Sequence, residues 1–354
     1  MTRRNTLSWL NSPLATPNPE MARLAQLRQA QLTKPTGSLG RLEEIAIRLA
    51  ALQNTTAPSV EQIHIAIFAG DHGVAVEGVS AFPQSVTSEM IRNFAHGGGA
   101  INVLARALNA SLEIINLGTV RDTQTLMDVR HFHLGLGTAN FLHEPAMTWD
   151  QLHQALNAGF ETIEHAKKNN KQLFIGGEMG IGNTTSATAL ACLLLNEQPS
   201  LLTGSGTGLD SKGITHKINV ITQALSLHRP QIISPLDALR RVGGFEIAAL
   251  TGAYIHGAQI GLPLLVDGFI STVAALTAEH VFPECKNWFL YSHRSTESGH
   301  DTILKALGAE PLIALDMRLG EGSGAAIALS LLRMACKLHN EMATFSEAQV
   351  SQKY

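Results

Sequence analysis

The stretch Leu173-Phe-Ile-Gly-Gly-Glu-Met-Gly-Ile-Gly-Asn-Thr-Thr185 gives the strongest indication of the fold. Its short apolar start is typical of a buried β-strand, and the glycines that follow are typical of a tight turn into a helix. Glycines let backbone N–H groups approach an anion, and Asn183 and Thr184 stand where that helix would begin. The spacing matches neither a GxGxxG dinucleotide site nor a phosphate-binding P-loop. An ordinary glycine-rich turn with a helix cap is the alternative.

Four more short apolar runs end at or beside a glycine or a histidine, and helical stretches separate them. The runs lie at 63–69, 112–117, 262–267 and 288–292. Helical spacing covers the regions near 85–108, 149–168, 184–195, 211–227, 244–260, 268–279 and 298–307. This alternation predicts an α/β fold, in which a doubly wound, mainly parallel sheet carries helices on both faces.

The two ends of the chain fall outside this alternation. Apolar residues at helical spacing occupy 21–49, with a break at Lys34-Pro-Thr-Gly37, and the last clear helix runs from about 324 to 338. We therefore expect a small helical domain formed by 1–60, with 330–354 packed on it, and an α/β domain over 61–329.

The composition excludes several classes of protein. Of 354 residues, 45% are apolar and 16% charged, which argues against disorder and coiled coils. A net charge of −3 offers no positive surplus for binding nucleic acid. The three cysteines are far apart and odd in number, so we expect no disulfide framework and a reducing cytoplasm. Neither a signal peptide nor a membrane span is predicted.

Polar side chains follow several of the predicted strands. Asp71, Glu178 and Asp267 lie beside glycine, or one residue from it, at three strand ends, and Ser292-His293 follow a fourth. Ligands of doubly wound sheets bind beyond the carboxyl ends of the strands, so we expect a site there. His131 and His133 have no nearby cysteine or carboxylate to complete a metal site. We predict no metal and no cofactor.

Two further features suit a phosphorylated ligand and its chemistry. Gly204-Ser-Gly-Thr-Gly208 precedes a helix that carries Lys217, and such a loop with one ammonium suits a monophosphate. A solvated loop and lysine are the alternative. Glu321 lies between glycines in Arg318-Leu-Gly-Glu-Gly-Ser-Gly-Ala-Ala326, where poor solvation would raise its pKa toward that of a general base. A glutamate stabilised by the helix dipole is the alternative.

Together these stretches resemble the nicotinate-nucleotide–dimethylbenzimidazole phosphoribosyltransferase family of cobalamin nucleotide-loop assembly. The resemblance spans roughly residues 20–345. It implies transfer of the ribose 5-phosphate of nicotinate mononucleotide to dimethylbenzimidazole, which yields α-ribazole 5′-phosphate and nicotinate. We also expect a homodimer. The matching stretches are Lys34-Pro-Thr-Gly-Ser-Leu-Gly-Arg-Leu-Glu43, Gly70-Asp-His-Gly-Val74, Gly177-Glu-Met-Gly-Ile-Gly-Asn-Thr-Thr185, Val242-Gly-Gly-Phe245, Gly261-Leu-Pro-Leu-Leu-Val-Asp-Gly-Phe269 and Met317-Arg-Leu-Gly-Glu-Gly-Ser-Gly-Ala325.

The same resemblance implies roles for individual residues. Glu321 matches the proposed general base of the family, and Glu178 is the alternative base. Residues of the first phosphoribosyl loop are matched by Glu178, Gly180, Asn183 and Thr184, and those of the second by Gly204, Gly206 and Lys217. The base pocket is expected to include Phe82, Met90, Asp71, His72, Asp267, Ser292 and His293.

Phe82 and Met90 depart from the family pattern. Some members have Ser and Gln at these positions, so this pocket is expected to be more apolar. The accepted base therefore stays open between a benzimidazole, a purine and a phenolic compound. The alternative is that both side chains simply fill core space.

Two other functions remain open from the residues alone. A nucleotide-dependent oxidoreductase would need GxGxxG after the first strand, and that fingerprint is missing. A non-catalytic protein that binds a nucleotide or cobamide precursor would keep the glycine loops, but it would have no use for a poorly solvated Glu321.

Overall fold

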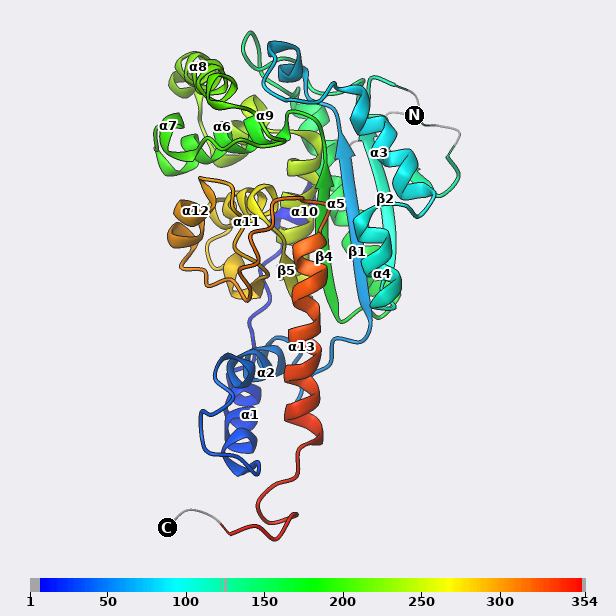
Figure 1. The fold of residues 1–354 in the computed structure, drawn as a ribbon, viewed down its shortest axis with the longest axis vertical. Coiled ribbons are helices and arrows are strands. Elements are labelled where there is room, and N and C mark those ends of the chain that lie inside the picture. Colours follow the sequence, from blue (N-terminus) through cyan, green and yellow to red (C-terminus); the bar gives the residue numbers. More distant parts are fainter. Residues whose placement is uncertain (1–6, 122, 124–125, 352–354) are drawn as a thin grey trace.

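The structure, a computed structural model, describes residues 7–121, 123 and 126–351 (Figure 1). Residues 1–6 and 352–354, which we assigned to the helical domain, lie outside this range. The six strands of its sheet are all parallel, in the order β3-β2-β1-β4-β5-β6. The chain therefore winds outward in both directions from β1 and β4, which confirms the predicted doubly wound α/β fold.

Five strands coincide with the predicted apolar runs, and the short edge strand β3 is additional. They are β1 (Ile63–Gly70), β2 (Ser111–Gly118), β3 (Val129–His131), β4 (Leu173–Met179), β5 (Leu264–Val266) and β6 (Phe289–Tyr291).

Alternate residues of β1 enter two separate hydrophobic cores. Ala66 and Phe68 pack in the core under α5 (Trp149–Lys168), α10 (Phe245–Ile260) and α11 (Phe269–Val281). Ile65 and Ile67 pack in the opposite core, under α3 (Ser85–Ala95), α4 (Ala100–Ala107) and α13 (Ser323–Glu341). The predicted helical region 85–108 is thus two helices, which Gly97 separates with a φ of +78°.

Helices also surround the carboxyl ends of the strands, at the top of Figure 1. They are α6 (Asn183–Leu195), α7 (Pro199–Leu202), α8 (Ser211–His228), α9 (Pro235–Val242) and, lower down, α12 (His300–Leu307). Short 3₁₀ turns lie at η1 (Ser8–Asn11), η2 (Gly73–Glu77), η3 (Arg229–Gln231) and η4 (Cys285–Trp288). In the described part of the chain, no helix is both long and apolar enough to cross a membrane.

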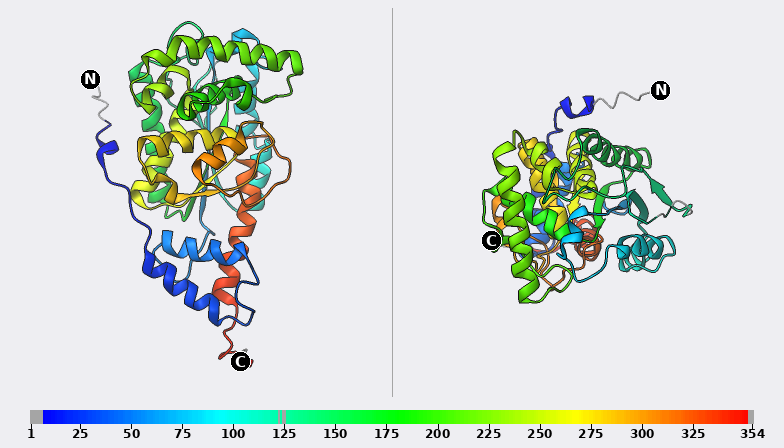
Figure 2. Two further views of the ribbon diagram at one scale, coloured as in Figure 1. Left: turned by 90° about the vertical axis from the view of Figure 1, so that its left-hand side faces the viewer. Right: turned by 90° about the horizontal axis from the view of Figure 1, so that it is seen from above.

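A small helical part lies beyond the amino end of the sheet (Figure 1). There α1 (Pro19–Gln31) and α2 (Arg41–Leu52) pack with the end of α13, and Arg28 Nε donates to the carbonyl of His339 at 2.7 Å. The segment before α1 lies instead along α5 and α10 (Figure 2). There Trp9 Nε1 donates to Asn157 Oδ1 at 2.7 Å. The division into two domains at residue 60 stays a prediction.

Glycines allow α5 and α10 to approach each other closely under the sheet. A Cβ on Gly159 would lie 2.6 Å from the backbone nitrogen of Ala253, and closer still to the carbonyl oxygen of Ala249. A Cβ on Gly252 would lie 2.9 Å from Cα of Leu156. The close packing of these two helices therefore requires glycine, which has no side chain, at both positions.

Gly159→Ala tests this contact. In an unhindered helix the change would stabilise the protein by up to about 1 kcal/mol. Here the methyl group meets backbone, so we expect the free energy of unfolding to fall by about 1–3 kcal/mol in urea denaturation. The control Lys168→Ala, on the exposed face of α5, should change it by less than about 0.5 kcal/mol. A Gly159→Ala protein at least as stable as wild type would contradict the packing argument.

Candidate active site

A cavity of about 470 Å³ opens at the carboxyl ends of the strands. Its wall includes Glu178 near the end of β4, Asp267 just after β5 and His293 after β6. Three of the polar side chains that follow the predicted strands therefore meet in one place.

Asp267 fixes the first turn of α13 at the bottom of this cavity. Its Oδ2 accepts a hydrogen bond from the backbone N–H of Gly322 at 3.1 Å, and its Oδ1 accepts one from Ala325 at 2.8 Å. Burial raises the pKa of Asp267, while His293 and these backbone amides act in the opposite direction. Nδ1 of His293 lies 3.7 Å from Asp267 Oδ1. The carboxyl group thus serves as a cap that reaches from β5 to α13.

Glu321 stands in the strained turn that leads into this helix. Its φ is +63°, in the left-handed region that non-glycine residues rarely adopt, at a cost of about 1–3 kcal/mol. The turn lies directly against β4, because a Cβ on Gly177 would come within 2.5 Å of the Glu321 carbonyl carbon. Strain of this kind persists where the surrounding structure fixes it, often at a functional site.

The carboxyl group of Glu321 is poorly solvated. The residue is 5% exposed, and its Oε2 has no hydrogen-bond partner among the described residues. Burial raises its pKa to about 7 and the charge of Asp267 adds to this, whereas the N–H of Ile101 acts against it. A carboxylate with that pKa is a competent base near neutral pH.

Glu178 is a second buried carboxyl group. Its Oε2 accepts a hydrogen bond from Nδ2 of Asn183, the first residue of α6. Burial and the charges of Glu246, Asp267 and Glu321 raise its pKa well above the usual value, and Asn183 only partly opposes this. Glu178 is therefore inclined to be protonated, so it can donate a hydrogen bond to a ligand in the cavity.

Lys217 reaches the cavity wall from behind. Its side chain is fully buried, and Nζ donates to Oγ1 of Thr184 at 2.7 Å. A Cβ on Gly206 would lie 2.9 Å from that oxygen and 3.3 Å from Nζ, so this glycine leaves room beside the ammonium. Burial lowers the pKa of Lys217 to about 8, although the charge of Glu297 raises it. The arrangement offers a positive charge and a hydroxyl group to an anion.

Eight of the predicted site residues line this cavity and the other seven do not. The eight are Phe82, Glu178, Gly180, Asn183, Thr184, Gly206, Asp267 and His293. Glu321 and Lys217 are next to lining residues, as described above. Gly204 faces Glu297, and Ser292 Oγ pairs with Nδ1 of His293 at 3.1 Å.

The geometry does not place Asp71, His72 or Met90 on the cavity wall, where we expected them. His72 is fully buried between Glu246 Oε1, at 2.7 Å, and Ser186 Oγ, at 2.8 Å. Asp71 accepts a hydrogen bond from the N–H of Val120 at 2.9 Å, and Met90 packs on the core beneath α3. Hydrogen bonds to buried groups hold His72 and Asp71, and Met90 packs against the hydrophobic core.

Several lining residues were not predicted. Arg318 and Leu319 belong to the glycine-rich stretch around Glu321, and Phe269 follows the glycine after Asp267. Glu297 comes from the loop after β6. Proximity to the strand ends is the signal that would have found them, but sequence spacing does not say which way a loop side chain points.

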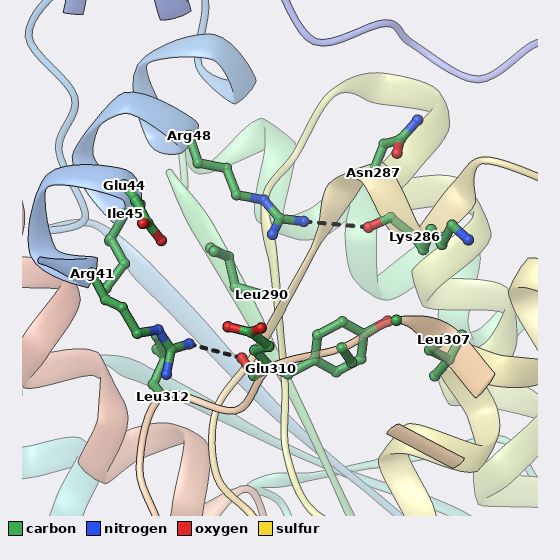
Figure 3. A pocket seen from close by; sticks show the side chains of 13 residues that line it. Arg41, Glu44, Ile45, Arg48, Lys286, Asn287, Leu290, Leu307, Glu310 and Leu312 are labelled. Carbon is green, nitrogen blue, oxygen red and sulfur yellow. Dashed lines mark hydrogen bonds between the residues drawn. The ribbon is translucent and has the colours of Figure 1, made fainter. Parts of the chain in front are cut away.

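A second cavity, of about 440 Å³, lies between α2 and the edge strand β6 (Figure 3). The guanidinium of Arg41 donates to the carbonyls of Pro311 and Glu310 at 2.7 and 2.9 Å, and that of Arg48 donates to Phe289 at 2.5 Å. None of the predicted site residues lines this cavity. Its two arginines attach the helical part to the sheet, so this cavity lies at a structural contact between these two parts of the fold.

Comparison with known proteins identifies the family of this chain. A family model described as phosphoribosyltransferase matches residues 14–350. A nicotinate-nucleotide–dimethylbenzimidazole phosphoribosyltransferase of Xanthomonas oryzae pv. oryzae is 58% identical over 97% of this chain and 98% of its own length. A relative of the same name from Ectopseudomonas mendocina is 57% identical over 98% and 99%.

A solved structure indicates the same family. The crystal structure of CobT from Thermus thermophilus superposes with a TM-score of 0.91 at 42% sequence identity. The match covers 95% of this chain and 100% of that one. Sequence motifs, fold and relatives agree, and the chain belongs to the nicotinate-nucleotide–dimethylbenzimidazole phosphoribosyltransferase family.

Proposed function

We propose that this enzyme transfers the 5-phosphoribosyl group of nicotinate mononucleotide to 5,6-dimethylbenzimidazole in the cavity beyond β4 and β5. Relatives that bear the name of this reaction match nearly the whole chain. The observation that carries the choice of site is the cavity itself, because Glu178, Thr184 and Asp267 line its wall. Glu321 follows the lining residue Gly320 and is a buried carboxylate whose pKa of about 7 suits a base. The products are α-ribazole 5′-phosphate and nicotinate.

One ring nitrogen of the benzimidazole attacks C1′ of the ribose from the face opposite nicotinate. The bond from C1′ to the pyridinium nitrogen breaks, and its electron pair stays with nicotinate. Glu321 takes the proton from the other ring nitrogen of the acceptor, so the product ring ends neutral. The pyridinium is already cationic and needs no acid to leave, and no pyrophosphate is released. One base and a site for the phosphate therefore suffice for this chemistry.

The phosphate of the donor is assigned to the corner formed by Thr184, Gly206 and Lys217. A buried ammonium carries three donors, and the hydrogen bond described for Lys217 goes to the neutral hydroxyl of Thr184, while the charge of Glu297 also acts on the ammonium. A phosphate beside Gly206 would accept further charge-assisted hydrogen bonds from Lys217.

The acceptor is assigned to the apolar side of the cavity. Phe82 is 52% exposed at the entrance, and Phe269 and Leu319 also line the wall. Thr207 Oγ1 lies 3.1 Å from Ser80 Oγ and 3.3 Å from the backbone nitrogen of Ala81. These contacts attach the loop before Phe82 to the glycine-rich loop Gly204–Gly208. An apolar wall favours a methylated benzimidazole over adenine, whose unmatched polar edge would cost about 1–3 kcal/mol when buried.

A homodimer and a cytoplasmic location remain predictions. Cys192, Cys285 and Cys336 are buried and free, which is in keeping with a reducing compartment.

Release of nicotinate tests the proposed base. Glu321→Gln removes the proton acceptor but keeps the size of the side chain, so we expect turnover to fall by at least about 10²-fold. Binding of nicotinate mononucleotide should persist. Glu310→Gln, an exposed control, should retain full turnover. Near-normal turnover in Glu321→Gln would shift the role to Glu178, and no nicotinate release by the wild type would favour a binding protein.

The raised pKa of Glu321 also predicts how stability depends on pH. Between about pH 4.5 and pH 7 the folded state holds a proton on Glu321 that the unfolded state has lost. Stability therefore falls as the pH rises through this range, because the folded state binds more protons. Glu321→Gln lacks this contribution. Urea denaturation at pH 5 and pH 8 should show the variant gaining stability relative to wild type at the higher pH, and a constant difference would argue against the raised pKa.

Lys217→Met tests the phosphate site. Loss of a hydrogen bond from a charged group should raise KM for nicotinate mononucleotide by about 10- to 100-fold. The effect should shrink with the nucleoside donor, which lacks the phosphate. Lys212→Ala, at an exposed position of the same helix, is the control and should leave KM unchanged. Equal losses with both donors would rule out a phosphate role.

A further inference from the structure

A separate group of potential metal ligands lies at the amino end of the sheet, on the face covered by α5. His64 is in β1, Glu113 is in β2 and His165 is in the last turn of α5. One ligand atom from each residue lies within 4.8 Å of the other two. The residues are 49 and 52 positions apart, so no local spacing in the sequence brings them together.

Ser111 orients the imidazole of His64. The hydroxyl oxygen of Ser111 lies 2.9 Å from the carbonyl oxygen of Ile63 and 3.0 Å from His64 Nδ1. The other ring nitrogen, Nε2, faces Oε2 of Glu113 at 3.1 Å. Either this nitrogen donates its hydrogen to the carboxylate, or its lone pair and the carboxylate oxygen together bind a metal ion.

The geometry around Glu113 suits a metal ion. Its Oε2 lies 3.1 Å from His64 Nε2 and 3.3 Å from His165 Nδ1. Two ligands of a tetrahedral zinc ion, each about 2.0–2.1 Å from the metal, are about 3.3 Å apart. His165 is 53% exposed and stands on a helix surface, so its side chain can adjust and water can complete the coordination.

A second layer of contacts holds these ligands. Oε1 of Glu113 pairs with Arg130 at 3.4 Å, and Arg130 shares its charge with Glu161. Ser111 orients the ring of His64 in the same way. Partners of this kind commonly orient metal ligands in proteins.

We propose that His64, Glu113 and His165 bind one divalent transition-metal ion of the zinc class. Two imidazoles and a carboxylate, with water in the open position, form a ligand set that suits Zn²⁺. The ion links β1, β2 and α5 and stabilises the fold at the end of the sheet remote from the cavity. It takes no part in the transfer reaction and is independent of the proposed function. The sequence analysis predicted no metal, because it considered only residues close together in the chain.

Metal binding is tested on the full, untagged chain after treatment with EDTA and removal of the chelator. Zn²⁺ at about 100 times its dissociation constant should raise the Tm by about 3 °C or more. Co²⁺, used as a spectroscopic probe, should give visible absorption that saturates at one equivalent. A wild-type protein that shows neither change would overturn the proposal.

Two variants on α5 make the test specific. His165→Gln removes an exposed ligand without disturbing the core, and it should abolish both the Tm shift and the saturable Co²⁺ absorption. His153→Gln changes a histidine of the same helix outside the cluster and should retain both. Equal responses in His165→Gln and wild type would place the metal elsewhere and overturn the assignment.

Discussion

The hydrogen bonds from Gly322 and Ala325 to the carboxylate of Asp267 are the contact on which the candidate site depends. They join the end of β5 to the start of α13 and so hold the turn that contains Glu321. Gly177 completes the arrangement, because only a residue without a side chain lets that turn lie against β4. The position of the proposed base is thus a consequence of how two strands and one helix meet.

Electrostatics follow from the same arrangement. Glu178, Asp267 and Glu321 are buried close together, and the pKa of each is raised by burial. A raised pKa favours the neutral form of each group, and the value of about 7 for Glu321 lets that carboxylate accept a proton near neutral pH. The cationic Lys217 lies instead beside Thr184 and Gly206, where the phosphate is assigned. The proposed base and the proposed phosphate site are thus formed by different side chains.

Much of this architecture could be predicted from the sequence, for identifiable reasons. Short apolar runs that end at or beside a glycine or a histidine marked five strands, whereas β3 is a three-residue edge strand and too short to give a pattern. Ligands of doubly wound sheets bind beyond the carboxyl ends of the strands, and this rule located Glu178, Asp267 and His293 at one edge of the sheet. It could not give the direction of a side chain. His72 follows β1, but its side chain makes a hydrogen bond with Glu246 on α10. The sequence around His72 gives no indication of this distant partner.

The most direct test of the account is the pKa of the Glu321 side chain itself. Carboxyl ¹³C NMR of the protein labelled at glutamate, with the resonance assigned by its loss in Glu321→Gln, follows this group alone as the pH changes. Burial in the strained turn predicts a midpoint of about 7. A midpoint near the ordinary value of 4.5 would show that the carboxylate is well solvated, and it would contradict the claim that the fold prepares Glu321 as a base at neutral pH.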